Sequence, residues 1–376
     1  MTSSLADTLR VLTPSLPPTL ITPGNLTDIR QVVRHLPGPI TSFFGFECPL
    51  EDISRTDILL RITAGQEGQS ILAGDSVVTS LPESIGDDLI WGRLQNFCRH
   101  WRDPCSVLNK NVKNIWLEFD ITGSSPDIPW PSCFFGPQPL YAQSAQRWVI
   151  ETALPLLWGH ALPATNQRKL LACLAELPGQ AHVFQIGIML PRKTNALRLC
   201  ILDIVPTQIP TYLTRLGWPG DANELATLID NLGQFVDTIA LDLDVDQTVL
   251  PKIGLECYFD HCRQPQHEPR WRSFLAYLTQ LGMCCPSKQA GLLAYPGYVR
   301  EKTQQTLWPE HLHTTSGLLG NHYESVFVKG IHHLKIVYRP DYRLQAKAYL
   351  YVGQGWLPVA AIKQQLDFYA TEARIS

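Results

Sequence analysis

Residues 182–204 consist of three successive runs, HVFQIGIML, PRKTNA and LRLCILDI. The first and third runs are rich in the apolar and β-branched residues that favour strands, and the middle run carries the Pro and Asn typical of a turn. Two strands joined by so short a connection pair antiparallel. This stretch therefore predicts a β-hairpin with strands over 182–190 and 197–204.

The same paired pattern occurs at four other places in the chain. Its members are 40–50 with 57–63, 112–121 with 132–136, 238–245 with 252–259, and 332–339 with 345–352. Five hairpins make ten predicted strands. Because each pair is antiparallel, the pattern argues against a βα barrel, whose single strands all run parallel.

Segments with helical periodicity lie between the hairpins. They cover 25–36, 83–102, 144–176 with a break near Pro163, 221–235, 269–281 and 358–371. The order helix, strand, strand therefore repeats five times. A ten-stranded antiparallel sheet is long enough to curl and close, which removes its exposed edges. We expect an α+β fold, a closed ten-stranded antiparallel β-barrel ringed by helices.

The chain is expected to form one domain over residues 21–376. Residues 1–20 contain two adjacent prolines and no long apolar run, so we expect a flexible N-terminal segment without a signal peptide. Residues 286–330 show no clear periodicity. Long irregular segments in compact domains are usually functional, so we expect a lid-like insertion over one mouth of the barrel.

The composition excludes several classes of protein. Lys and Arg number 31 against 34 Asp and Glu, so the chain lacks the basic field that a nucleic-acid binder needs. With 45% apolar residues it is not a disordered protein, and its apolar runs fall short of the ~18 residues of a membrane helix. We expect a cytoplasmic protein, which favours reading its 10 cysteines as reduced and mostly buried thiols.

Strand alternation places many polar residues inside the predicted barrel. If helices cover the outside, the more apolar face of each strand points outward, so Ala346 and Ala348 face out while Lys347, Tyr349 and Tyr351 face in. The rule also points inward Phe43, Glu47, Arg61, Trp116, Glu118, Asp120, Gln185, Arg198, Asp242, Glu256, Tyr258, His333, Lys335, Arg339 and Gln345. Unpaired charges in a dry core are costly, so the pattern predicts a ligand chamber.

The predicted chamber residues suit three chemical roles. The cations Arg61, Arg198, Lys335 and Lys347, with the hydroxyls of Tyr349 and Tyr351, suit an anion such as a diphosphate. Glu118 and Glu256 are the predicted catalytic carboxylates, which accept a proton or an N–H group. Trp116, Tyr258 and Gln185 complete the predicted substrate-binding set, in which aromatic faces shield a carbocation. The alternative, that Arg and Glu on neighbouring strands form structural ion pairs, stays open.

Familiar motifs of other enzyme classes are missing. The chain contains no GxGxxG, GxxxxGK[ST], GxSxG, HExxH or DDxxD sequence. Five histidines fall within 311–333, but without a zinc-binding spacing they favour a polar loop over a metal site. We therefore predict no metal ligands.

The repeated helix-strand-strand order resembles the PT-barrel of the ABBA aromatic prenyltransferases over about residues 24–371. Lys347-Ala348-Tyr349 resembles the lumen-facing Lys-x-Tyr that grips the diphosphate in the indole prenyltransferases. Glu118, within WLEFD, resembles the Glu that binds the indole N–H in those enzymes. Arg61 and Arg198 lie on strands where the family places further diphosphate ligands. The family often has Tyr two residues after such a cation, whereas here Cys200 follows Arg198 and Gly254 follows Lys252.

The resemblance implies a transferase that moves an allylic prenyl group from its diphosphate to an aromatic, indole-like small molecule or peptide, in natural-product biosynthesis. It implies no cofactor, although Mg²⁺ accompanying the diphosphate stays open. Two alternatives remain. The first is acid/base cyclisation or hydrolysis by Glu118, Glu256 and Asp120, and the second is a non-catalytic barrel that binds a ligand or peptide. Donor length, acceptor identity and oligomeric state are not predicted.

Overall fold

A computed structural model describes residues 4–359 apart from 78, 80, 83–84, 86–87, 122, 124–127, 143–145 and 193, and without the side chain of Asn321. The helix expected over 358–371 therefore lies almost wholly outside the described residues. The first residues of the helices expected over 83–102 and 144–176 also lie partly outside them.

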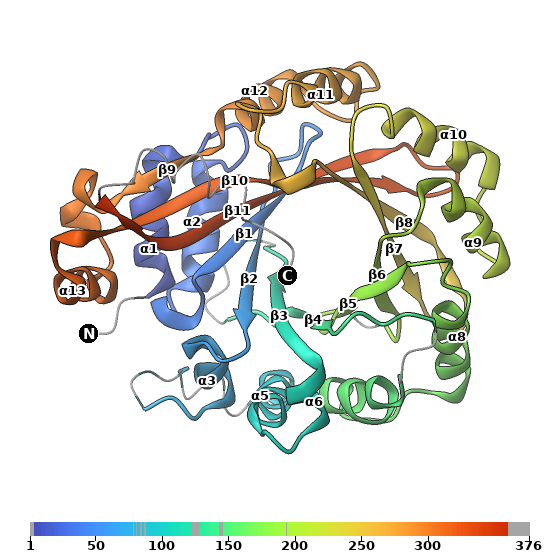
Figure 1. Ribbon diagram of the computed structural model, residues 1–376, viewed down its shortest axis with the longest axis horizontal. Coiled ribbons are helices and arrows are strands. Elements are labelled where there is room, and N and C mark those ends of the chain that lie inside the picture. Colours follow the sequence, from blue (N-terminus) through green and yellow to red (C-terminus); the bar gives the residue numbers. More distant parts are fainter. Residues whose placement is uncertain are drawn as a thin grey trace.

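Ten of the strands in the described residues form a closed antiparallel barrel (Figure 1). They are β1 (Phe43–Pro49), β2 (Asp57–Thr63), β3 (Val112–Phe119), β4 (Ser132–Pro137), β5 (His182–Ile188), β6 (Leu197–Leu202), β7 (Thr238–Val245), β8 (Val249–Tyr258), β10 (Tyr323–Tyr338) and β11 (Gln345–Pro358). Neighbours in sequence pair with one another, β10 follows β8, and β11 closes the ring by pairing with both β10 and β1. The predicted fold class is confirmed.

Helices surround the barrel on its outside, as Figure 1 shows. They include α2 (Pro23–Val33), α3 (Glu67–Ala73), α5 (Leu89–Arg102), α6 (Val107–Asn111), α7 (Leu154–Trp158), α8 (Ala164–Ala175), α9 (Ile209–Arg215), α10 (Ala222–Leu232) and α11 (Arg270–Gln280). A π-helical turn, η3 (Val149–Ala153), leads into α7. Short 3-10 turns are η1 (Thr13–Ser15), η2 (Gly38–Ile40), η4 (Pro206–Gln208), η5 (Asp260–Cys262), η6 (Glu301–Thr303), η7 (Gln305–Leu307) and η8 (Gly320–His322).

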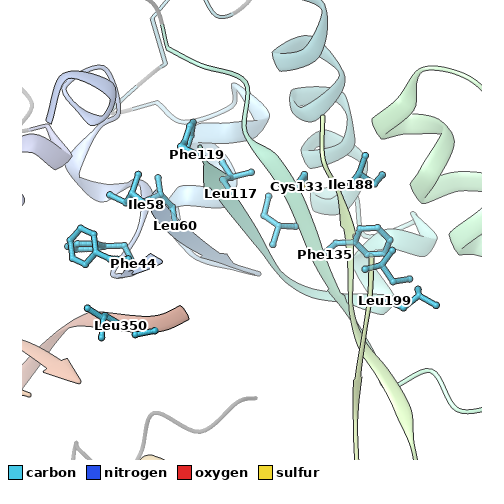
Figure 2. Packing of buried hydrophobic residues seen from close by; sticks show 14 of the residues in the cluster. Phe44, Ile58, Leu60, Leu117, Phe119, Cys133, Phe135, Ile188, Leu199 and Leu350 are labelled. Carbon is cyan, nitrogen blue, oxygen red and sulfur yellow. The ribbon is translucent and has the colours of Figure 1, made fainter. Parts of the chain in front are cut away.

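The hydrophobic core lies between the barrel wall and the helices. Outward-facing strand residues such as Leu60, Leu117, Phe135 and Leu199 are fully buried there, as Figure 2 shows. Burying a side chain of this size stabilises the fold by about 1.5–3 kcal/mol. Because this outer layer supplies the apolar packing, the inside of the barrel is free to carry polar groups.

The N-terminal segment is a packed part of the domain. Helix α1 (Leu5–Leu12) begins at a capping box between Ser4 and Asp7, and it buries Leu5, Leu9 and Leu12. The prediction of a flexible segment is therefore wrong for residues 4–20. A helix of eight residues is too short to show a clear period beside the Pro17-Pro18 break.

Residues 286–330 contain regular structure, where the sequence suggested an irregular segment. They form α12 (Pro286–Ala294), a short strand β9 (Gly297–Arg300), α13 (Glu310–Leu319) and the first half of β10. Strand β9 pairs with β10 over Val326–Lys329 and extends the sheet beyond the closed ring. Prolines and glycines divide the segment into pieces too short to show periodicity. Its role as a lid stays a prediction.

A β-bulge in β10 changes which side chains face the lumen. The register of β10 against β11 shifts between Ile331 and His333, so His332 is an extra residue in the strand. A bulge lets two consecutive residues point to the same side. Both His332 and His333 consequently line the interior of the barrel.

Candidate active site

The barrel encloses a cavity of about 450 Å³. Its lining includes these predicted site residues: Arg61, Trp116, Glu118, Gln185, Arg198, Glu256, Tyr258, Lys335, Tyr349 and Tyr351. Lys347 lines a smaller cavity of about 30 Å³, which shares Arg198, Asp242, Lys335 and Tyr349 with the larger one. The structure thus places the predicted site residues on two cavities that share part of their lining, while the roles of these residues stay predictions.

Lys335 on β10 is paired with carboxylates of two other strands. Its ammonium contacts Asp242 on β7 and lies 3.4 Å from Oε1 of Glu256 on β8. Burial alone would lower the pKa of Lys335, but the charges of Asp242 and Glu256 outweigh it and raise that pKa. Lys335 therefore stays charged and is neutralised within the protein.

Glu256 is held ionised by its neighbours. The Tyr258 hydroxyl donates a hydrogen bond of 2.5 Å to Oε2, and Nε2 of His333 lies 3.4 Å from Oε1. Burial acts to raise the pKa of Glu256, but the charges of His333 and Lys335 and the hydrogen bonds keep it well below its ordinary value. A carboxylate this well partnered is better suited to positioning these groups than to accepting a proton.

Arg198 forms a bidentate ion pair with Asp244. Its Nε lies 2.7 Å from Oδ1 and its Nη2 lies 3.1 Å from Oδ2. Nζ of Lys252 lies 3.9 Å from the same carboxylate. Two cations thus share Asp244, which leaves this part of the small cavity with an excess of positive charge.

Lys347 and Tyr349 of the Lys-x-Tyr sequence both contact Glu47 on β1. The Lys347 ammonium pairs with Oε1, and the Tyr349 hydroxyl donates a hydrogen bond to Oε2. Burial works to raise the pKa of Glu47, but Lys347 and the Tyr349 hydrogen bond lower it to about 2. Glu47, which the sequence placed in the lumen without a role, therefore anchors this pair.

Glu118 on β3 is different, because its buried carboxyl makes no hydrogen bond or ion pair with the described residues. Burial, and then the charge of Glu47, raises its pKa to about 7. A carboxyl with such a pKa is present in both protonation states near neutral pH. This is the property expected of a general acid or base.

Arg61 on β2 lies against aromatic rings rather than a carboxylate. Its guanidinium sits 4.3 Å above the centre of the Phe43 ring, and the Tyr351 ring is stacked against the same Phe43 at 5.5 Å and 11°. Trp116 meets Phe43 edge-on at 5.9 Å. The Arg61 guanidinium therefore contacts the ring of Phe43, which in turn packs on Tyr351 and Trp116.

Two adjacent histidines of β10, His332 and His333, line the lumen, and strand alternation predicted only the second of them. Nδ1 of His332 lies 2.7 Å from Nδ1 of His333, and the His333 ring stacks on Tyr349 at 4.3 Å and 17°. Burial and the charge of His333 lower the pKa of His332 to about 3. Alternation placed His333 inward, but only the bulge brings His332 in as well, and the His-His doublet is the one signal for it in the sequence.

Three residues predicted to face the lumen lie elsewhere. Asp120 pairs with Arg55 at 3.2 Å and with Arg192 at 3.1 Å, beyond the end of β3. Arg339 stacks over Tyr342 at 3.9 Å, and Gln345 is exposed. Alternation is unreliable at strand ends, because the chain leaves the barrel wall there.

Comparison with known proteins gave structural neighbours alone. No protein-family model and no curated protein matches this chain. It is similar to the apo form of the prenyltransferase PriB, at 12% identity and a TM-score of 0.48, over 93% of this chain and 94% of that one. It is also similar to 5-dimethylallyltryptophan synthase from Streptomyces coelicolor, at 12% identity and a TM-score of 0.47, over 93% of this chain and 98% of that one. A third neighbour is PriB in ternary complex with L-tryptophan and dimethylallyl thiolodiphosphate, at 11% identity and a TM-score of 0.48, over 93% and 94% of the two chains.

Three further findings concern metal sites, membrane-spanning helices and cysteines among the described residues. No group of three or more His, Cys, Asp or Glu side chains there is arranged to hold a metal ion. No helix among them has the length and apolar character needed to span a membrane. Eight of the ten cysteines are buried, which agrees with the prediction that most of them are.

Proposed function

We propose that the barrel lumen is the active site of a transferase that moves an allylic prenyl group from its diphosphate to an aromatic acceptor. The observation that carries this proposal is the position of Glu118. Its unpartnered carboxyl, with a pKa raised to about 7, lines a chamber that aromatic side chains and cations also line. These are the parts that an electrophilic substitution on an aromatic ring requires.

The diphosphate is assigned to the cationic floor, defined as Arg198, Lys252, Lys335 and Lys347 around the small cavity. Burial, and then repulsion from Arg198, lowers the pKa of Lys252 to about 8. A bound anion would relieve this repulsion. As the bond between the prenyl carbon and oxygen breaks, its electron pair goes to the diphosphate, where fixed cations stabilise the charge that develops.

Aromatic side chains next to the floor suit the resulting allylic cation. Tyr258 and Tyr349 line the cavity, and the Tyr349 ring lies 5.5 Å from the Lys335 ammonium. The electron-rich faces of such rings stabilise a cation and keep water from it. Water exclusion favours transfer to the acceptor over hydrolysis.

Glu118 is assigned to the acceptor. As a carboxylate it accepts the N–H of an indole-like ring and raises the electron density of that ring. The ring attacks the allylic cation and a carbon–carbon bond forms. Glu118, whose pKa is raised to about 7, then takes the proton that the ring loses as it regains its aromaticity. Positioning the two substrates against each other supplies much of the acceleration.

The first experiment measures thermal stabilisation by dimethylallyl and geranyl diphosphates. A ligand that binds the folded state at one hundred times its Kd stabilises it by about 2.7 kcal/mol. We expect a shift in Tm with the prenyl diphosphates and a prenylated product, detected by mass spectrometry, when indole derivatives are added. Absence of any shift at saturating diphosphate would refute the prenyl transfer.

A second candidate function is favoured by the ion pairs of the floor. Arg198, Lys335 and Lys347 each already contact a carboxylate, so a diphosphate has to compete with Asp244, Asp242 and Glu47 for them. Acid/base cyclisation or hydrolysis by Glu118 needs no diphosphate. Turnover of a substrate by the wild type but not by Glu118→Gln, without stabilisation by prenyl diphosphates, would support this alternative. A role in natural-product biosynthesis and a cytoplasmic location accompany both candidates as predictions.

A further inference from the structure

Strand β11 continues past its partner β1 at one mouth of the barrel. The two strands are paired as far as Gly353 of β11, and the backbone N–H of Gln354 donates a further hydrogen bond of 2.8 Å to the carbonyl oxygen of Ser42. β11 runs on to Pro358, paired on its other side with β10 (Figure 1). No described strand lies on the β1 side of residues 355–358, and we call this side the open edge.

The chain that precedes β1 turns toward β2 and does not follow the open edge. Oγ1 of Thr41 lies 2.6 Å from the carbonyl oxygen of Arg61 on β2. Backbone groups of alternate residues in a strand point to the same side. Trp356, two residues after Gln354, therefore presents its N–H and C=O to the open edge. Pro358 has no N–H, so the edge can pair with only a short added strand.

Two cavities meet at the open edge, one on each face of the sheet. Besides the lumen, a second cavity of about 290 Å³ lies between the barrel wall and helices α1 and α13. Ser42 and Gln354 line both cavities. Phe43 lines the lumen, whereas its neighbour Phe44 lines the second cavity. Because successive side chains of a strand point to opposite faces, the cavities lie on opposite sides of the wall that β1 and β11 form.

The second cavity suits an apolar side chain of moderate size. Phe44, Phe327 and Leu312 are buried and line it. Its polar lining includes Thr8, Gln66, Glu67 and His311. An apolar side chain placed against the two phenylalanines and the leucine leaves water, which favours binding.

We propose that the open edge binds a linear peptide as an added strand beside β11, with successive side chains entering the lumen and the second cavity. In such strand addition main-chain hydrogen bonds provide affinity, and pockets for alternate side chains provide specificity. A small aromatic molecule needs the lumen alone, whereas cavities on both faces of one edge match the alternation of a strand. That the peptide is the prenyl acceptor, through an aromatic residue, rests on the proposed function, whereas the strand site itself does not.

The test measures the affinity of the full chain for acetyl-Leu-Trp-Leu-amide by calorimetric titration. When the Trp side chain enters the lumen, the leucines face the second cavity and their backbone groups meet Trp356 of β11. N-methylation of both leucines should weaken binding at least about tenfold, because it removes hydrogen bonds to β11. N-methylation of the peptide Trp, whose N–H points away from β11, is the matched control and should leave the affinity unchanged.

Gln66→Trp tests the second cavity. Gln66 is exposed, lines this cavity and makes no side-chain capping bond to α3, so the protein should fold without it. We expect the variant to bind acetyl-Leu-Trp-Leu-amide no more tightly than acetyl-Ala-Trp-Ala-amide. Gln280→Trp, on an exposed residue of α11 outside both cavities, is the matched control and should keep the preference for leucine.

Equal affinity for the unmodified and the leucine-methylated peptide would overturn the proposal. So would prenylation of acetyl-tryptophan amide by a protein that binds the peptide no more tightly than this amide, and that result would leave the proposed function intact. Tight, methylation-sensitive binding without prenylation in the presence of dimethylallyl diphosphate would instead refute transfer to the peptide and leave the strand site standing.

Discussion

Lys335 and Asp242 form an ion pair that passes over Gly254. Lys335 lies on β10 and Asp242 on β7, 93 residues apart in sequence, and β8 runs between these strands. Gly254 on β8 pairs in register with Asp242. A Cβ added at Gly254 would lie 2.4 Å from Cε of Lys335 and 3.3 Å from Cβ of Asp242. The missing side chain of Gly254 is what allows the ion pair to cross β8.

We predict that Gly254→Ala destabilises the protein by about 1–3 kcal/mol, because the added methyl displaces Lys335 from Asp242. Urea unfolding followed by circular dichroism measures the change. Gly297→Ala is the matched control, since a Cβ there meets nothing within 4 Å. Equal stability of Gly254→Ala and the wild type would show that Lys335 moves aside without loss.

Replacing Lys335 by Met should cost about 3–5 kcal/mol, because it leaves Asp242 and Glu256 buried without their shared cation. The double variant Lys335→Met with Asp242→Asn should be more stable than the sum of the single changes indicates. Additive effects in this double-mutant cycle would mean that the two residues are not coupled.

Glu118 should make stability depend on pH. Its ordinary pKa of 4.5 is raised to about 7 in the folded state, so the folded protein binds the proton more tightly than the unfolded chain. Stability therefore falls as pH rises from 4.5 to about 7. Glu118→Gln should remove this dependence and exceed the wild type by roughly 1–3 kcal/mol above pH 7. Parallel profiles of the two proteins between pH 5 and 8 would contradict the raised pKa.

His332 should remain neutral throughout the physiological range, because burial and the charge of His333 lower its pKa from 6.5 to about 3. The unfolded chain binds this proton more readily, so His332 contributes stability above pH 6.5 that is lost as the pH falls toward 3. Nuclear magnetic resonance of its imidazole carbon-bound protons, assigned with His332→Asn, should show no titration between pH 5 and 8. A midpoint near 6.5 would place the ring in contact with solvent.

Much of the barrel could be predicted because strand alternation and turn residues are local signals. The predicted strands 57–63 and 238–245 coincide with β2 and β7, and the others agree within a few residues except at β10 and β11. Those two strands run on as a paired extension of the barrel, to Tyr323 and Pro358. Residues 323–331 are almost all buried, so their pattern lacks the polar alternation that would mark a strand.

The site was predictable in its residue types but not in its pairings. Periodicity placed Lys347, Tyr349 and Glu118 on lumen faces, since side chains alternate across a strand. It gave no reason to expect that Glu47 holds Lys347 and Tyr349 while Glu118 stays without a partner. Such pairings depend on the shear and closure of the barrel, which set the residues that face each other across strands distant in sequence.

The amino-acid sequence by itself determined the ten strands of the ring, their antiparallel pairing and the polar character of the inner face, because each follows from short-range patterns. Tertiary structure decided where the charges act. Closure of the ring gathered Arg198, Lys252, Lys335 and Lys347 around one small cavity. It left Arg61 on β2 away from that cavity, opposite Phe43 at the start of β1. The bulge at His332 added a histidine pair that alternation does not predict. All three carboxyls of Glu47, Glu118 and Glu256 are buried, but the fold surrounds them with different charges. The pKa of Glu118 is therefore raised, whereas those of Glu47 and Glu256 are lowered.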